Sequence, residues 1–383
     1  MKFRKLTALL LSATMAAGLL AGCGDQGSGQ SSSPSPSQNT SQQPSDSQPS
    51  DNQPSDSQPS GGASGESSLK GKRVRVVIGS TSTGGDSYMI ADMVTRYLGE
   101  EMGFNGKVDP VGNAAALDAI ATASGDGTTI MMFHDMTFLS VMFGAVDAKY
   151  GLENMTVGPR IGQNPGGCFA AHADAPYDSI AGAAQWLKDN PDQTVRVNIE
   201  AGGASHLVFA AYWLWIQETY GDDVAGRVKA IVGGSTDEKK QRLWDNNADI
   251  IYGDYSAFVE FTKEGVEAQL AMKMMDPADK IEGVDLPTMA DNGVTFDGDP
   301  YVYSKEFAMY FPKDMDQGIL EEITAAMQKV CENPDFQAEM AAMKYKAVSA
   351  DETALAASQQ FIQDKADTCK KIIDIAPSLD SLT

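Results

Sequence analysis

Two glycine-rich turns contain the residues of this sequence whose types and spacing could bind an anion. The first, at 79–87, follows a β-branched run at 74–78 and precedes a helical pattern of apolar residues. The second, at 200–206, stands between an alternating apolar run and another helical pattern. A strand that ends in small, hydroxylated residues before a helix leaves free backbone N–H groups at the positive end of the helix dipole. Each turn therefore predicts an anion site, although an ordinary β–α connection would show the same pattern.

Alternating strands and helices must position these turns. The predicted strands are 74–78, 107–112, 128–133, 156–161, 167–171, 194–199, 228–232, 249–252 and 307–311, and the main predicted helices are 113–124, 180–187, 207–219, 237–246, 317–331, 335–344 and 351–375. This alternation predicts an α/β fold with mostly parallel sheets. Because ligands bind at the carboxyl ends of strands in doubly wound sheets, we expect two doubly wound α/β domains around a ligand cleft that closes by a hinge.

The 383 residues are enough for two domains of ordinary size. A change of character near residues 173–179 suggests a boundary, and the last helices return to the first domain. We therefore assign residues 69–173 and 301–383 to domain 1 and residues 174–300 to domain 2.

Residues 1–22 predict an export signal. Lys2, Arg4 and Lys5 precede an apolar run at 6–20 that is too short for a usual transmembrane helix. The run ends in Leu20-Ala21-Gly22-Cys23, which resembles the bacterial lipoprotein signal. That resemblance implies removal of the segment before Cys23 and lipidation of this cysteine, and the alternative is a plain secretory signal with a chance cysteine.

Residues 23–68 predict a tether. From residue 24 onward this segment is rich in Ser, Pro and Gln, and Ala63 is its one hydrophobic residue. Such a composition cannot bury enough apolar surface to fold. A flexible coil of this length spans roughly 40 Å on average and about 140 Å when stretched, so it would hold a globular body away from a membrane surface.

The charge limits the classes of partner. The formal net charge is −23, and removal of residues 1–22 makes it more negative still, which disfavours nucleic acid and anionic lipid. An anionic ligand would have to be captured by local dipoles. Of the cysteines after Cys23, Cys331 and Cys369 fall on predicted helices and could pair, whereas a buried free cysteine is the alternative for each.

The order of motifs over residues 74–355 resembles the extracytoplasmic receptors of tripartite tricarboxylate transporters, also called Bug-type receptors. The matching segments are Val76-Val77-Ile78, Thr83-Gly84-Gly85-Asp86-Ser87, Gly112-Asn113-Ala114, Asp126-Gly127-Thr128-Thr129-Ile130, Gly202-Gly203-Ala204-Ser205-His206-Leu207, Gly233-Gly234, Ala248-Asp249, Asp285-Leu286-Pro287-Thr288 and Tyr310-Phe311-Pro312. The first loop departs from the family pattern, because residues 80–83 are Ser and Thr where prolines and a third glycine are usual.

The resemblance implies a fold like that of type II periplasmic binding proteins and a monomer on the extracytoplasmic face of the cell membrane. It also implies a small organic acid as ligand, often a di- or tricarboxylate, which backbone amides and hydroxyls hold. The partner would be the membrane permease of a tripartite tricarboxylate-type transporter.

The candidate ligand-binding residues are small, hydroxylated or ionisable. They are Thr81, Ser82, Thr83, Gly84, Gly85, Asp86, Ser87, Asn113, His134, Asp135, Gly203, Ala204, Ser205, His206, Gly234 and Asp254. Charge-assisted hydrogen bonds from such groups to a carboxylate contribute about 1.5–3 kcal/mol each.

Several candidates also have a structural interpretation. Asp86 could cap a helix, His206 could be a buried structural histidine, His134 and Asp135 could belong to a simple loop exit, and Asp254 could be a turn residue. We expect Trp213 and Trp215 in the core. We expect Arg160 at the surface, with a ligand carboxylate as its alternative partner.

Enzymatic interpretations have little support. The sequence has no phosphate-binding Gly-x-x-x-x-Gly-Lys-Ser/Thr motif, no Gly-x-Ser-x-Gly elbow and no His-Glu-x-x-His, and its three histidines are too scattered to predict a zinc site. We therefore expect a lipid-anchored binding protein, with no cofactor or metal, that delivers a small organic acid to a permease. The alternatives are a receptor that signals to a membrane kinase and an extracytoplasmic hydrolase.

Overall fold

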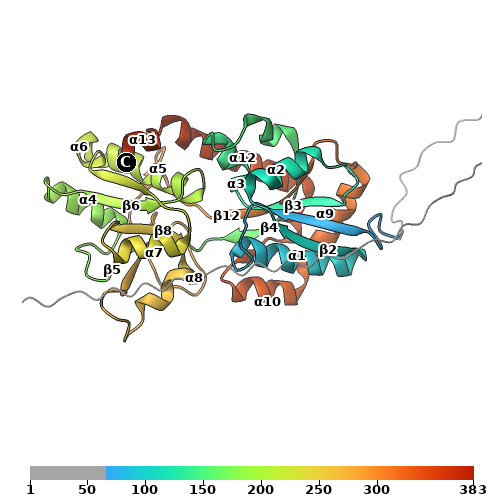
Figure 1. Ribbon diagram of the computed structural model, residues 1–383, viewed down its shortest axis with the longest axis horizontal. Helices are drawn as coiled ribbons and strands as arrows, with labels where there is room; N and C mark the ends of the chain where they lie inside the picture. The colour runs from blue at the N-terminus through green and yellow to red at the C-terminus, as the bar shows by residue number, and fades with distance from the viewer. Residues whose placement is uncertain (1–65) are drawn as a thin grey trace, which may run out of the picture. The chain divides into compact units, whose positions relative to one another are not determined.

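The computed structural model describes residues 66–383, which form two lobes (Figure 1). The predicted signal, Cys23 and nearly all of the tether lie outside the described residues. Each lobe has one β-sheet with helices packed against it. Among the described residues, no helix combines the length and apolar character needed to cross a membrane.

The first lobe is built on a six-stranded mixed sheet in the order β13-β4-β12-β3-β1-β2. The strands are β1 (Arg73–Ile78), β2 (Asn105–Pro110), β3 (Thr129–Phe133), β4 (Met155–Asn164), β12 (Lys305–Pro312) and β13 (Lys346–Ala347). The helices are α1 (Asp86–Met102), α2 (Asn113–Thr122), α3 (Met136–Met142), α9 (Gln317–Glu332), α10 (Pro334–Ala342), α11 (Ala350–Thr353) and α12 (Leu355–Ile375). β1 pairs in parallel with β2 and β3, whereas β12 is antiparallel to β3 and β4.

The second lobe is built on a five-stranded sheet in the order β7-β6-β8-β5-β9. The strands are β5 (Gly167–His172), β6 (Val195–Ile199), β7 (Val228–Val232), β8 (Ile250–Asp254) and β9 (Met272–Pro277). The helices are α4 (Ile180–Asp189), α5 (Ala204–Tyr220), α6 (Asp222–Ala225), α7 (Thr236–Trp244) and α8 (Tyr255–Phe258). A small ribbon of β10 (Thr295–Phe296) and β11 (Asp299–Pro300) follows β9, and the short helix α13 (Leu379–Leu382) contacts β7.

The chain crosses between the lobes after β4, again between β9 and β12, and a third time after α12. The first crossing lies near Gly166, earlier than the boundary predicted at residues 173 and 174, because β5 pairs with β8 and β9. The change of character that suggested the boundary is the end of β5 within the second lobe. The second predicted boundary, at residue 301, where the chain returns to the first lobe, lies close to the start of β12.

The predicted strands and helices are present, and the fold differs from the prediction in several ways. Both sheets are mixed, so the prediction of mostly parallel sheets is wrong. β9 was not predicted, because Met272–Pro277 is rich in methionine and lacks β-branched residues. The single helix predicted at 351–375 is broken at Ala354, whose backbone angles (φ −53°, ψ 140°) are not helical, between α11 and α12.

The structure also tests what the sequence analysis expected of two tryptophans and two cysteines. Trp213 and Trp215 are buried in α5, as predicted. Cys331 and Cys369 are buried and free, the second of the two possibilities for them.

A buried network of charges lies inside the first lobe. The Arg160 Nε donates to Glu306 at 2.6 Å, and the two side chains are 3% and 0% exposed. Asp135 accepts from the Tyr303 hydroxyl at 2.6 Å and forms an ion pair with Lys365 at 2.7 Å. The surface position predicted for Arg160 is therefore wrong, because β4 turns this side chain toward Glu306 and α12.

We predict that Glu306→Ala lowers the free energy of unfolding by about 3–5 kcal/mol, because the Arg160 guanidinium would stay buried without its carboxylate. The matched control is Asp109→Ala, which breaks the solvent-exposed pair with Arg75 and should cost about 1 kcal/mol or less. Urea denaturation of both variants measures the difference. Equal losses would contradict the structural role of the buried pair.

Candidate functional site

A cavity of about 700 Å³ opens between the two lobes. The first lobe lines it with the turn after β1 and with residues that follow β3, and the second lobe with the turns after β6, β7 and β8. Asn164, Gly167, Tyr303 and Lys305 line it from the crossing segments. Because these are strand ends, the cavity occupies the position that doubly wound sheets offer to ligands.

The first turn is held by its own hydroxyl groups. The Ser80 Oγ accepts from the Ser82 backbone N–H at 3.1 Å, and the Ser82 Oγ accepts from the Gly84 N–H at 3.2 Å. α1 then begins after Gly85 without a side-chain cap. The loop is therefore shaped before any ligand arrives, with the amino end of α1 at the cavity.

The second turn is held by one serine. The Ser205 Oγ accepts from the Glu200 N–H at 2.8 Å and donates to the Glu200 carbonyl at 3.1 Å. Gly202 has φ +76°, a conformation that favours glycine. α5 begins after Gly203 without a side-chain cap or an acidic residue in its first turn, and Gly203, Ala204 and Ser205 line the cavity. The positive end of this helix therefore lies at the cavity wall.

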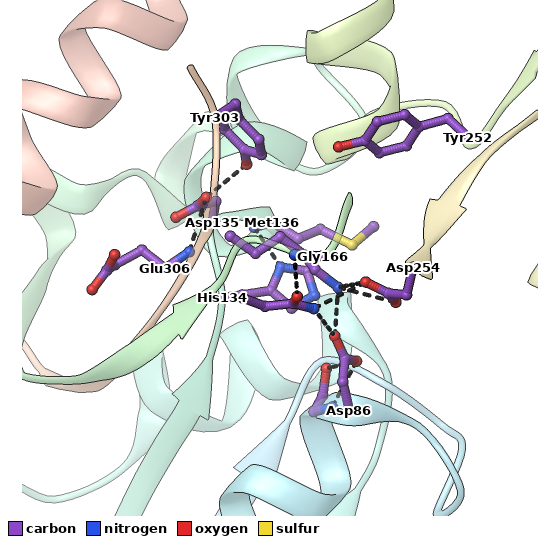
Figure 2. A network of polar contacts seen from close by, with 12 residues as sticks. Asp86, His134, Asp135, Met136, Gly166, Tyr252, Asp254, Tyr303 and Glu306 are labelled. Carbon is purple, nitrogen blue, oxygen red and sulfur yellow. Dashed lines mark hydrogen bonds and ion pairs between the residues drawn. The ribbon is translucent and has the colours of Figure 1, made fainter. Parts of the chain in front are cut away.

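Between the turns lies an ion cluster of Asp86, Asp254, Lys305 and Asn164, which we call the interlobe cluster. The Lys305 Nζ lies 2.5 Å from an Asp86 carboxylate oxygen and 3.2 Å from an Asp254 oxygen. The Asn164 Nδ2 donates to Asp254 at 2.9 Å. Figure 2 shows Asp86 and Asp254 converging on this point from different parts of the chain.

The charges of neighbouring side chains shift the pKa values of Asp86 and Lys305 in this cluster. Burial alone would raise the pKa of Asp86, but the Lys305 ammonium, together with the hydrogen bonds from Lys305 and the Ser87 N–H, holds that pKa below its ordinary value. Burial would lower the pKa of Lys305, but Asp254 and Asp86 hold it well above its ordinary value. The cluster therefore has two carboxylates around one ammonium near neutral pH.

A buried lysine, Lys239, also lines the cavity from the second lobe. The Lys239 Nζ donates to the Tyr252 carbonyl at 3.1 Å, and only 4% of Lys239 is exposed. Burial lowers the pKa of Lys239, with Glu200 acting against it. Burial likewise raises the pKa of Glu200, with Lys239 acting against it.

His134 is neutral at the cavity wall. Burial, followed by the nearby Lys305 ammonium, lowers the pKa of His134 to about 4. The His134 Nδ1 accepts from the Met136 N–H at 3.2 Å. Among residues 66–383, no group of three or more His, Cys, Asp or Glu side chains is placed to hold a metal ion.

Most of the predicted site residues line the cavity. They are Thr81, Ser82, Gly84, Gly85, Asp86, Ser87, His134, Gly203, Ala204, Ser205, Gly234 and Asp254. The fold therefore brings the two glycine-rich turns together across one cleft.

Four predicted residues lie elsewhere. Thr83 is exposed at the tip of its loop. Asn113 donates to the Ser140 Oγ at 2.7 Å, and Asp135 is fully buried in the network of the first lobe.

His206, the fourth, stacks on Phe143 with 4.0 Å between ring centroids and accepts from the Gly202 N–H at 3.3 Å. His206 therefore has the buried structural position that the sequence analysis gave as the alternative to ligand binding.

Lys305, Asn164 and Tyr252 were missed. The partners of Lys305 in the interlobe cluster are distant in sequence, so no local pattern could have revealed them. Asn164 is the last residue of β4, and the sequence of this strand contains no motif that indicates a binding site. Tyr252 had a signal, because an aromatic residue stands at the end of a predicted strand just before Gly253 and Asp254.

Comparisons with known proteins give a consistent fold. No protein-family model matches the sequence, and a search of curated proteins finds no match. Among solved structures, MatC from Rhodopseudomonas palustris with bound malate has a TM-score of 0.61 at 14% identity, over 79% of this chain and 99% of MatC. The periplasmic binding protein BugD has a TM-score of 0.58 at 18% identity, over 79% and 96%. A TctC solute-binding protein from Polaromonas has a TM-score of 0.58 at 14% identity, over 79% and 98%.

These matches define the class of fold. The chain has the two-domain architecture of type II periplasmic binding proteins, as predicted. Its structural neighbours are solute-binding proteins of the TctC and Bug type, the group that the order of sequence motifs resembles.

We predict that His206→Gln makes stability less sensitive to acid. Burial lowers the pKa of His206 to about 4 in the folded state, below the ordinary value of 6.5, so the unfolded state binds more protons between these values. The native chain should therefore lose about 2 kcal/mol more than the variant as pH falls from 6.5 to 4. Urea denaturation across this range, with pH 8 as reference, measures the difference. Parallel curves would contradict the buried neutral position of His206.

Proposed function

We propose that this protein is an extracytoplasmic solute-binding protein that captures a small organic acid in the cleft between its lobes. The observation that carries the proposal is the pair of glycine-rich turns, each at the uncapped start of a 17-residue helix, on one cavity. The amino end of α5 favours negative charge, whereas the Asp86 carboxylate already accepts from the Ser87 N–H at the start of α1. The structural neighbours include a protein with bound malate.

The cargo would then pass to a membrane permease of the tripartite tricarboxylate type. The support is the likeness of the fold to TctC and Bug-type proteins together with the order of sequence motifs. The lipoprotein-like signal ending at Cys23 and the long tether support an anchored protein at the outer face of the cell membrane.

A hydrolase is less well supported by the cleft. A serine nucleophile needs a histidine base within hydrogen-bond reach. The Ser205 hydroxyl is instead bonded to the backbone of Glu200, and the His134 Nδ1 accepts from a backbone N–H. Ser205 and His134 therefore bind the backbone of the cleft walls and do not form a nucleophile and base pair with each other.

We predict that a small organic acid raises the thermal unfolding midpoint of the chain from residue 24 onward. A ligand at 100 times its Kd adds about 2.7 kcal/mol to the free energy of unfolding. The panel should contain mono-, di- and tricarboxylates, amino acids and aromatic acids, with titration calorimetry to confirm each hit. Absence of any shift across the panel would contradict the proposal.

The matched variant is Gly203→Val. A Cβ atom at Gly203 meets no heavy atom within 4 Å, and its backbone is extended, so the fold should tolerate the substitution. The added side chain would occupy the cleft at the start of α5. Binding should weaken at least about tenfold while the midpoint without ligand stays unchanged. Equal affinity would place the ligand elsewhere.

A further inference from the structure

We propose that the hinge contains a second binding site, for a small uncharged molecule with an apolar body and one hydroxyl group, and that a molecule bound there favours the closed cleft. The site is a different cavity from the cleft and takes a different class of ligand, so it goes beyond the proposed function. Only its effect on acid binding rests on that function.

The second site is a cavity of about 230 Å³ beside the segment that leads into β12. This segment forms a wall between the two cavities, because Tyr303 lines both, Lys305 lines the cleft and Ser304 lines the second cavity. The other walls are one face of α12 from the first lobe and Leu207 and Asp279 from the second. We call this space the hinge cavity, and both lobes contribute to it.

Ser304 is the point at which the chain changes lobe. Its Oγ donates to Asp279 of the second lobe at 2.5 Å, whereas its carbonyl accepts from the Lys365 ammonium on α12 of the first lobe. The residue before it donates its backbone N–H to the Ala278 carbonyl of the second lobe at 2.9 Å. The residue after it begins β12 and pairs with β4 of the first lobe. A rotation of the lobes about this point would therefore move the walls of the hinge cavity.

Closure would change the cleft and the hinge cavity in opposite senses. The two cavities lie on opposite sides of the segment that contains the pivot. A rotation that brings the lobes together over the cleft therefore draws α12 and Leu207 apart on the other side. A molecule that fills the hinge cavity holds these walls apart, so it binds the closed form more tightly and shifts the chain toward that form.

Apolar walls and one free hydroxyl define the class of ligand. Leu207, Phe361 and Ile372 line the hinge cavity, as does Val302, which is 54% exposed. Tyr301 also lines it, and the buried Tyr301 hydroxyl has no hydrogen-bond partner among the described residues. An apolar cavity of about 150 Å³ is large enough to bind benzene, so this one has room for a ring with one polar group. A hydroxyl on that ring can donate to the Tyr301 oxygen or accept from it.

The charged side chains of the hinge cavity already have partners. Lys365 forms its ion pair with Asp135, the carboxylate that also accepts from the Tyr303 hydroxyl (Figure 2). Asp279 accepts from the Ser304 hydroxyl. A charged ligand would have to break one of these contacts or remain unpaired at low dielectric, whereas an uncharged ligand leaves them in place.

The test of the site uses phenol and cyclohexanol, with benzylammonium as the charged ring for comparison. Cys369 lines the hinge cavity and is 3% exposed, so its alkylation by iodoacetamide reports whether the cavity is filled. In the chain from residue 24 onward, we expect phenol and cyclohexanol at millimolar concentration to slow this alkylation saturably, and benzylammonium to have no effect. Cys331, which is buried outside this cavity, is the internal control in the mass spectrum.

Two variants assign the protection to the free hydroxyl. Tyr301→Phe should weaken protection by phenol about fivefold at an unchanged unfolding midpoint, since the hydroxyl has no partner within the described fold. Tyr150→Phe is the control, because the Tyr150 hydroxyl donates to Asp118 at the surface and this residue lines neither cavity. It should bind phenol like the native chain.

The link to closure is measured by titration calorimetry of an acid that binds the cleft. Saturating phenol should tighten acid binding about fivefold or more, and the acid should tighten phenol binding by the same factor. Cys369 should also react faster with acid bound and phenol absent, because the hinge cavity is then wider.

The outcomes separate this inference from the proposed function. Unprotected Cys369, or equal protection in the native chain and Tyr301→Phe, would overturn the site. Acid affinity that is unchanged or lower at saturating phenol would overturn its link to closure. Protection of Cys369 in a chain that binds no acid of the panel would overturn the proposed function and leave the hinge site standing.

Discussion

The Lys305 ammonium between two carboxylates is the contact on which the rest of the cleft depends. Asp86 starts α1 of the first lobe, Asp254 ends β8 of the second, and Lys305 begins β12 where the chain returns from one lobe to the other. One side chain thus bridges both lobes at the floor of the cavity. The next residue, Glu306, pairs with Arg160 in the buried core, so alternation along one strand serves the cleft and the core in turn.

Around this floor the walls are mostly backbone. The hydroxyls of Ser82 and Ser205 are used to fix their own turns. Because Asp86 occupies the start of α1, the start of α5 is left as the source of positive potential. This arrangement lets a strongly acidic chain hold an anion, because the dipoles act locally while the net charge is spread over the surface. The floor, by contrast, has an excess of negative charge.

The sequence predicted the parts of the fold that depend on local pattern. The turns after β1 and β6, the helices that follow them and their position on one cleft all follow from glycine, hydroxyl residues and apolar spacing. The predictions that were wrong concern contacts between residues that are distant in the sequence. The antiparallel insertion of β12 between β3 and β4, the place of β5 in the second sheet and the burial of Arg160 depend on partners far away in the chain. Lys305 was missed for the same reason, and Asp135 was misplaced because its partners, Tyr303 and Lys365, come from the last third of the chain.

The most direct measurement is a crystal structure of the chain with the tightest-binding acid of the panel. The account predicts that the acid lies in the interlobe cavity, with its carboxylate within about 3 Å of the backbone N–H groups that begin α5. An acid bound outside this cavity, or one whose carboxylate lies on Lys305 after displacing Asp86 and Asp254, would contradict the central claim that the start of α5 holds the anion.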